Sequence, residues 1–183
     1  MKKFYLLIIL CFFAISLKVK AQAFPVPENY SLKLKEDYPK YEKDVINTVD
    51  WLAQTPWSEQ VEKRKMADSF IFQWVSGSPT INIVYREDIL TKICTKNKEF
   101  FFSYTGGYLK YALQNKNEKD YFDENKAKLA GLRAVISKYN SEPDRVKDKN
   151  VEYLIKVDEE GKLEDWVTTF MKNGEQKQTL KSL

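Results

Sequence analysis

The sequence contains no histidine, and only two cysteines occur among its 183 residues. The absence of histidine excludes a Ser-His-Asp triad, a Cys-His pair and a histidine-ligated zinc site. Cys11 lies in an N-terminal apolar run, so Cys94 has no partner in the rest of the chain and a disulfide framework is excluded. Any catalysis would have to proceed without histidine, and a pair of carboxylates could in principle supply it.

The chain without its first 23 residues has no net charge. The whole chain has 30 basic and 26 acidic residues, but its first 23 residues contain four lysines and no acid. The remaining chain has 26 residues of each sign, and this neutral balance does not suit a nucleic-acid binder. We therefore expect no nucleic-acid partner.

The N-terminus has the pattern of a cleavable signal peptide. A basic start, Met1-Lys2-Lys3, precedes an uncharged apolar run from Phe4 to Leu17. A spanning helix needs about 20 apolar residues, so this run is too short for a membrane anchor. Cleavage after Ala21 and cleavage after Ala23 both fit the small-residue rule. We expect residues 1–23 to be removed and the mature chain to be secreted or periplasmic, without a membrane span.

Beyond this segment, the apolar periodicity predicts a single compact all-α domain of about six to seven helices over residues 41–172. Three prolines favour an extended lead-in over residues 24–40. The expected helices run from Tyr41 to the Thr55-Pro56 break, from a Thr55 or Ser58 cap to Gly77, and over residues 86–94, 98–115, 120–139, 149–159 and 163–172. Residues 80–85 are expected to be a connector, because a lone strand has no partner, and the polar residues 173–183 are expected to fray.

Residues 98–115 are apolar on nearly every side, which is typical of a helix buried at the centre of a bundle. Gly106 and Gly107 lie in its middle, where each glycine costs about 1 kcal/mol relative to alanine. Three explanations stay open: a neighbouring helix or aromatic ring packs against the bare backbone, the helix breaks in two, or a ligand approaches there. Close packing is the favoured explanation.

Four residues are weak candidates for a binding site: Trp57, Gly106, Gly107 and Tyr108. Trp57 follows Pro56 in a turn, where an exposed indole can anchor a partner or a sugar ring, although covering the end of a helix pair is the favoured role. No residue is assigned to catalysis. The acidic stretch around Gly161 resembles a calcium loop only superficially, because Lys156 and Val167 occupy ligand positions that need acids. We therefore expect neither a metal nor a cofactor.

Spaced residues across most of the mature chain form a pattern: Trp51-Leu52, Thr55-Pro56, Glu62-Lys63-Arg64, Phe70, Trp74, Gly77-Ser78-Pro79, Gly106-Gly107 and the stretch from Gly161 to Trp166. This pattern resembles a family of small exported helical proteins of Bacteroidetes that have no assigned function. The resemblance implies export and a bacterial envelope setting. It brings no catalytic residues to this chain.

These observations favour an exported, non-catalytic helical domain that binds an unknown protein or small ligand. Two alternatives stay open. A helical carrier would enclose a small apolar ligand near Gly106 and Gly107, which requires a cavity there and is excluded by a tight helix crossing. A histidine-free enzyme would require a cleft with two facing acids, at least one of them with a raised pKa.

Overall fold

The structure is a computed structural model that describes residues 23–170. This part of the chain is all-α and contains no strand, which confirms the expected fold class. Its elements are a 3-10 helix, η1 (Lys35–Tyr41), and the α-helices α2 (Glu42–Gln54), α3 (Val61–Gly77), α4 (Glu87–Ile93), α5 (Phe100–Asn115), α6 (Glu124–Ser141) and α7 (Lys149–Glu159), with a further helical stretch over residues 163–170. The expected frayed tail and the expected signal peptide, apart from Ala23, lie outside the described residues.

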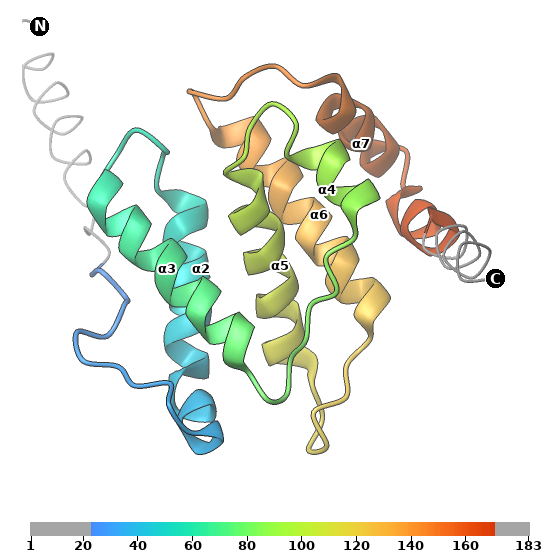
Figure 1. Cartoon of the computed structure of the whole chain (residues 1–183). Coiled ribbons are helices and arrows are strands. Elements are labelled where there is room, and N and C mark those ends of the chain that lie inside the picture. The colour runs from blue at the N-terminus through green and yellow to red at the C-terminus, as the bar shows by residue number, and fades with distance from the viewer. Residues whose placement is uncertain (1–22, 171–183) are drawn as a thin grey trace, which may run out of the picture.

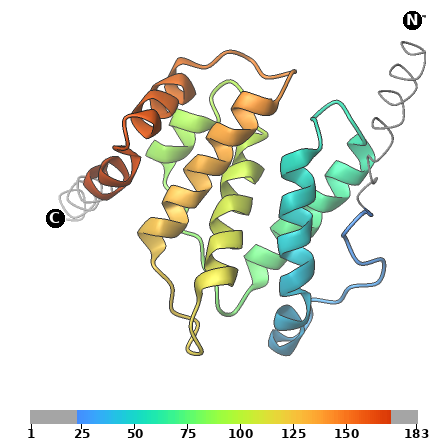
Figure 2. The same cartoon turned by 180° about the vertical axis from the view of Figure 1, so that it is seen from behind.

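Helix α5 lies at the centre of the fold, as its apolar sequence predicts. Figures 1 and 2 show the α2–α3 pair on one side of it and α4, α6 and α7 on the other. Tyr108 and Leu109 of α5 join the buried cluster formed with α2 and α3, whereas Phe100 and Tyr104 join the cluster formed with α4, α6 and α7. The core therefore consists of two apolar clusters that share one helix.

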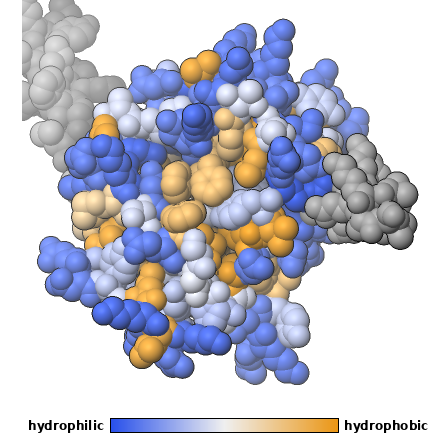
Figure 3. Space-filling view, viewed as in Figure 1, coloured by the Kyte–Doolittle hydropathy of each residue, from blue (hydrophilic) through white to orange (hydrophobic). Residues whose placement is uncertain are grey.

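On the face shown in Figure 3, apolar side chains gather over the centre and hydrophilic residues surround them. The large apolar side chains that are exposed belong to the lead-in, α3, the loops and α7. Within residues 23–170, the structure has no helix with both the length and the apolar character needed to cross a membrane.

Helix α3 presents the core face that its periodicity predicts. Phe70 and Trp74 are fully buried, and the Trp74 indole N–H donates to the carbonyl of Tyr38 at 3.1 Å. The Tyr38 ring packs on Trp74 with ring centroids 5.9 Å apart. These contacts fix the lead-in to the outer side of the α2–α3 pair.

Three helix starts differ from the sequence expectations. The lead-in is not extended to residue 40, because the Asp37 carboxylate accepts from the backbone N–H of Leu34 at 3.0 Å and begins η1. Helix α3 is capped by neither Thr55 nor Ser58. It begins after Gln60, which has a left-handed φ of 48°, and the Thr55 hydroxyl donates back to a carbonyl of α2.

Helix α6 begins four residues later than expected, at Glu124 instead of Asp120. Asp120 has a φ of 59° and lies in the preceding turn. The Asp123 carboxylate caps the helix by accepting from the backbone N–H groups of Asn125 and Lys126, at 2.9 and 3.1 Å. The residues 80–85 form no strand, which confirms the expected connector.

Helices α5 and α6 cross at a point where both have glycine. A Cβ atom on Gly107 would lie 2.6 Å from the Ala130 carbonyl oxygen and 2.6 Å from the Ala134 Cβ. A Cβ atom on Gly131 of α6 would lie 2.8 Å from the ring of Tyr104. The bare backbone therefore lets the two helices approach closely, and this contact offsets the helix-propensity cost of the glycines.

Replacing Gly107 by valine is expected to destabilise the fold by about 2 kcal/mol, because an inserted side chain overpacks the crossing. Chemical denaturation with circular dichroism measures the loss. The valine replacement of Gln114, an exposed residue of the same helix, is the matched control. Equal stability of the two variants would show that the crossing tolerates a side chain at residue 107.

Candidate ligand-binding pocket

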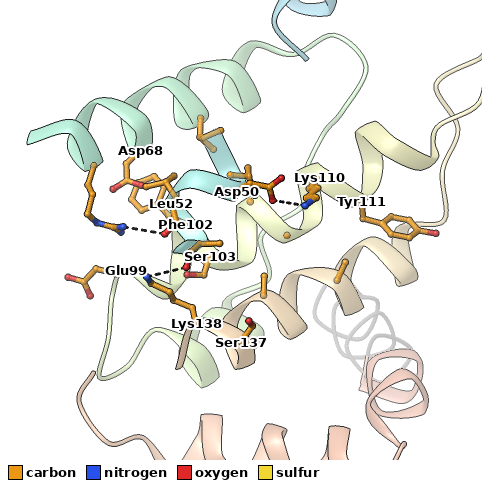
Figure 4. A pocket seen from close by; sticks show the side chains of 18 of the residues that line it. Asp50, Leu52, Asp68, Glu99, Phe102, Ser103, Lys110, Tyr111, Ser137 and Lys138 are labelled. Atoms are coloured by element: carbon orange, nitrogen blue, oxygen red, sulfur yellow. Dashed lines mark hydrogen bonds and ion pairs between the residues drawn. The ribbon is translucent and has the colours of Figure 1, made fainter. Parts of the chain in front are cut away.

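A pocket of about 350 Å³ lies between α2, α3, α5 and α6 (Figure 4). Glu99 and Ser137 line it and are exposed, whereas Ile71, which also lines it, is only 1% exposed. The pocket therefore leads from the surface towards the junction of the two apolar clusters. Its apolar walls are formed by Val49, Leu52, Ala53, Ile71, Phe102, Ala130 and Ala134, together with Gly106 and Gly107.

Small side chains on two helix faces explain why space remains here. Ser103, Gly106 and Gly107 lie at successive helical spacings on α5 and line the pocket. Ala130, Ala134 and Ser137 do the same on α6. The close α5–α6 crossing fixes these two faces as one wall, and these six residues are too small to fill the space in front of it.

Two buried cations at one end of the pocket bind the end of α2. The Arg64 guanidinium donates from Nη1 to the carbonyls of Leu52 and Thr55, at 3.3 and 2.8 Å. The Lys138 ammonium donates to the Thr55 carbonyl at 2.7 Å. The last carbonyls of a helix lack partners within it and carry partial negative charge, so both cations serve the fold as C-terminal caps.

Lys138 also pairs with a buried carboxylate. The Glu142 Oε2 atom lies 3.0 Å from Lys138 Nζ, and the Glu142 side chain is fully buried. The same oxygen accepts from the backbone N–H of Trp57 at 3.0 Å. Glu142 therefore joins the turn after α2 to the end of α6.

Asp68 lies in the same pocket and differs from these groups because its side chain has no hydrogen bond or ion pair within residues 23–170. Figure 4 shows its side chain extending from α3 towards Leu52 and Phe102. Its Oδ1 atom is buried and accepts no hydrogen bond from residues 23–170. Burial raises the pKa of Asp68 to about 6, against the opposing charge of Arg64, and the negative charge of Glu99 adds to the increase.

At the other end of the pocket, two charges neutralise each other. Lys110 of α5 forms an ion pair with Asp50 of α2, and both side chains are 35% exposed. Figure 4 shows the two groups pointing towards one another across the pocket wall. This pair leaves neither group as a free donor or acceptor for a deeply placed ligand.

Of the four candidates from the sequence, Gly106 and Gly107 line the pocket. The contact of Gly107 with α6 confirms close packing as the explanation for this glycine, and the approach of a ligand stays a prediction, because the pair also borders the cavity. Tyr108 is 1% exposed and turns into the core, where its ring contacts Phe122. Trp57 lies outside the pocket.

The Trp57 indole is half-buried and packs on Phe100, with ring centroids 5.2 Å apart. Its Nε1 atom is buried and has no hydrogen-bond partner within the described part of the chain. The residue therefore covers the α2–α3 turn. It does not stand out from the surface as an anchor.

Sequence reasoning missed Asp68, Arg64 and Lys138, because the periodicity places Arg64 and Lys138 on solvent-facing sides of their helices and nothing in the sequence singles out Asp68. The signal that could have found the pocket is the stripe of small residues on α5 and α6. Within residues 23–170, no group of three or more histidine, cysteine, aspartate or glutamate residues is placed to hold a metal ion. Comparisons with protein-family models, curated proteins and solved structures give no match to this chain.

Proposed function

We propose that this chain is an exported, non-catalytic binding protein that takes a small, mainly apolar ligand into the pocket between α2, α3, α5 and α6. The observation that carries this proposal is the pocket itself, which has a volume of about 350 Å³ and whose wall exposes mainly apolar surface, although six charged side chains line it as well. Small-molecule sites of proteins are typically about 300–1,000 Å³ and combine apolar walls with a few polar groups. Gly106 and Gly107 border this pocket, as the carrier alternative requires, but the close α5–α6 crossing at Gly107 is present as well and counts against that alternative.

A small ligand is favoured over a protein partner by the formed pocket, and the large exposed apolar residues outside the central patch of Figure 3 add no second grouped surface. Phe72, Val84, Tyr121 and Tyr153 are each more than half exposed, but they belong to α3, a connector, a loop and α7. Apolar residues scattered singly over a surface are ordinary and need no partner. The N-terminal segment and the resemblance to exported Bacteroidetes proteins support export to the periplasm or beyond.

The size of the pocket sets the expected affinity. A ligand that buries about 200 Å² of apolar surface gains about 5 kcal/mol from the hydrophobic effect. Association costs several kcal/mol, and polar contacts add to the gain, so we expect dissociation constants in the micromolar range or weaker.

A carboxylate enzyme is the second candidate, because Asp68 and Glu99 line one pocket and the pKa of Asp68 is raised. It is less well supported, since Glu99 is exposed at the pocket mouth while Asp68 lies deeper. A bound ligand recovered chemically unchanged after prolonged incubation favours the binding protein. A ligand converted at a rate that depends on Asp68 favours the enzyme.

Titration with N-phenylnaphthylamine, a neutral apolar fluorophore, tests the pocket. We expect saturable fluorescence enhancement at one site per chain and at least a tenfold weaker affinity for Ser103→Phe, which places a ring in the pocket. Asn140→Phe adds the same ring to an exposed residue of α6 and is expected to bind as the unmodified chain does. Saturable binding that is unchanged in Ser103→Phe, or no saturable binding at all, would contradict the proposal.

A further inference from the structure

We infer that the ligand carries a protonated amine on its apolar body and that the carboxylate of Asp68 binds this ammonium group. The inference rests on the proposed function and adds the chemical class of the ligand to it. Two observations support it. The cations of the pocket already have partners, and the buried Oδ1 atom of Asp68 has none within the described residues.

The three cations of the pocket are already bonded. Arg64 and Lys138 donate to the carbonyls at the end of α2, and Lys138 pairs with the fully buried Glu142 as well. Lys110 pairs with Asp50. A carboxylate or phosphate on the ligand would have to break one of these contacts, and leaving a buried group without its partner costs about 1–3 kcal/mol.

Asp68 differs from the other polar groups that line the pocket because its Oδ1 atom is buried and accepts no hydrogen bond within residues 23–170. It lies one helical turn after Arg64 on α3, yet the guanidinium is held by Leu52 and Thr55, and no ion pair joins the two side chains within the described residues. Its buried Oδ1 therefore has an acceptor position that no donor of the described residues fills. An alkylammonium group provides three N–H donors and a compensating charge.

The surroundings of Asp68 suit a cation with an apolar tail. Glu99 lies at the exposed pocket mouth and adds a second negative charge on the route to Asp68. Leu52, Ile71 and Phe102 line the space next to it and can cover a hydrocarbon chain or a ring. The opposing charge of Arg64 weakens this attraction and favours a ligand whose amine reaches the carboxylate directly.

Isothermal titration calorimetry with octylamine, octanol and octanoate tests the inference, because the three probes share one chain and differ in the head group. At pH 7.5 we expect octylamine to bind at least tenfold more tightly than octanol, and octanoate to bind most weakly. Asp68→Asn is expected to remove the octylamine preference and to change octanol affinity less than threefold, so octanol reports that the pocket is intact. Glu59→Gln, which removes an exposed carboxylate in the turn before α3, is the charge control.

Each result bears on a different claim. Equal binding of the three probes, tightest binding of octanoate, or an octylamine preference that survives in Asp68→Asn would overturn the ammonium inference and leave the apolar pocket standing. Saturable binding of none of the probes would overturn the inference together with the proposed function.

Discussion

Replacing Lys138 by methionine is expected to destabilise the fold by about 3–5 kcal/mol, the range measured when one partner of a buried ion pair is removed. Glu142 is fully buried, and without Lys138 the donors to its carboxylate within residues 23–170 are the backbone N–H groups of Trp57 and Asp144. The end of α2 also loses one of its two capping cations. Methionine has nearly the length of lysine, so the loss reports on charge and hydrogen bonding and less on volume.

Urea denaturation followed by circular dichroism measures this loss. Lys126→Met is the matched control, because Lys126 lies on the same helix and is exposed. We expect the control to change the free energy of unfolding by less than about 0.5 kcal/mol. A Lys138→Met variant as stable as this control would show that the ion pair with Glu142 does not hold the two helix ends together.

Asp68→Asn is expected to stabilise the protein by about 2 kcal/mol at pH 8, the opposite sign to most substitutions at half-buried residues. The folded state raises the pKa of Asp68 from 3.8 to about 6, so it disfavours the ionised carboxylate relative to the unfolded chain. A shift of this size corresponds to about 3 kcal/mol of lost stability wherever both states are ionised. The asparagine amide still needs partners in the pocket and retains part of that penalty.

The pH dependence gives this prediction its test. Above pH 6 the folded state carries the full penalty of the charge. As the pH falls through about 6 towards 3.8, the folded state binds the proton first, and the advantage of Asp68→Asn declines to near zero. Thermal or urea unfolding between pH 4 and pH 8 measures the difference, with Glu59→Gln as the control for an exposed acid. A constant difference across this range would show that Asp68 titrates normally.

The helices could be predicted from the sequence, because each depends on the local apolar periodicity and on the proline or glycine residues that end it. Pro56 and the Gly77–Pro79 stretch end the helices as expected, and Gly161, with a φ of 70°, ends α7. The first residues of the helices were harder to predict. The starts of η1 and α6 depend on which aspartate bonds which backbone N–H, and the left-handed Gln60 before α3 has no signature in composition.

The pocket could be predicted only in part from the sequence. Gly106 and Gly107 were recognised as residues that need an explanation, but the sequence does not say that one helix contacts them while a cavity borders them as well. Asp68 could not be singled out among 26 acids, because its missing hydrogen bond is a property of the packed helices around it. Arg64 would read as its partner at this spacing, and only the structure shows the guanidinium bonded to α2 instead.

Methyl NMR of the protein titrated with octylamine tests the central claim, that the pocket between α2, α3, α5 and α6 is the binding site. The account predicts saturable shifts of the Val49, Leu52 and Ile71 methyl groups, which line the pocket. The Leu154 and Val167 methyl groups lie in the other apolar cluster and are expected to stay unchanged. Shifts confined to Leu154 and Val167, or no saturable shift of the pocket methyl groups, would contradict it.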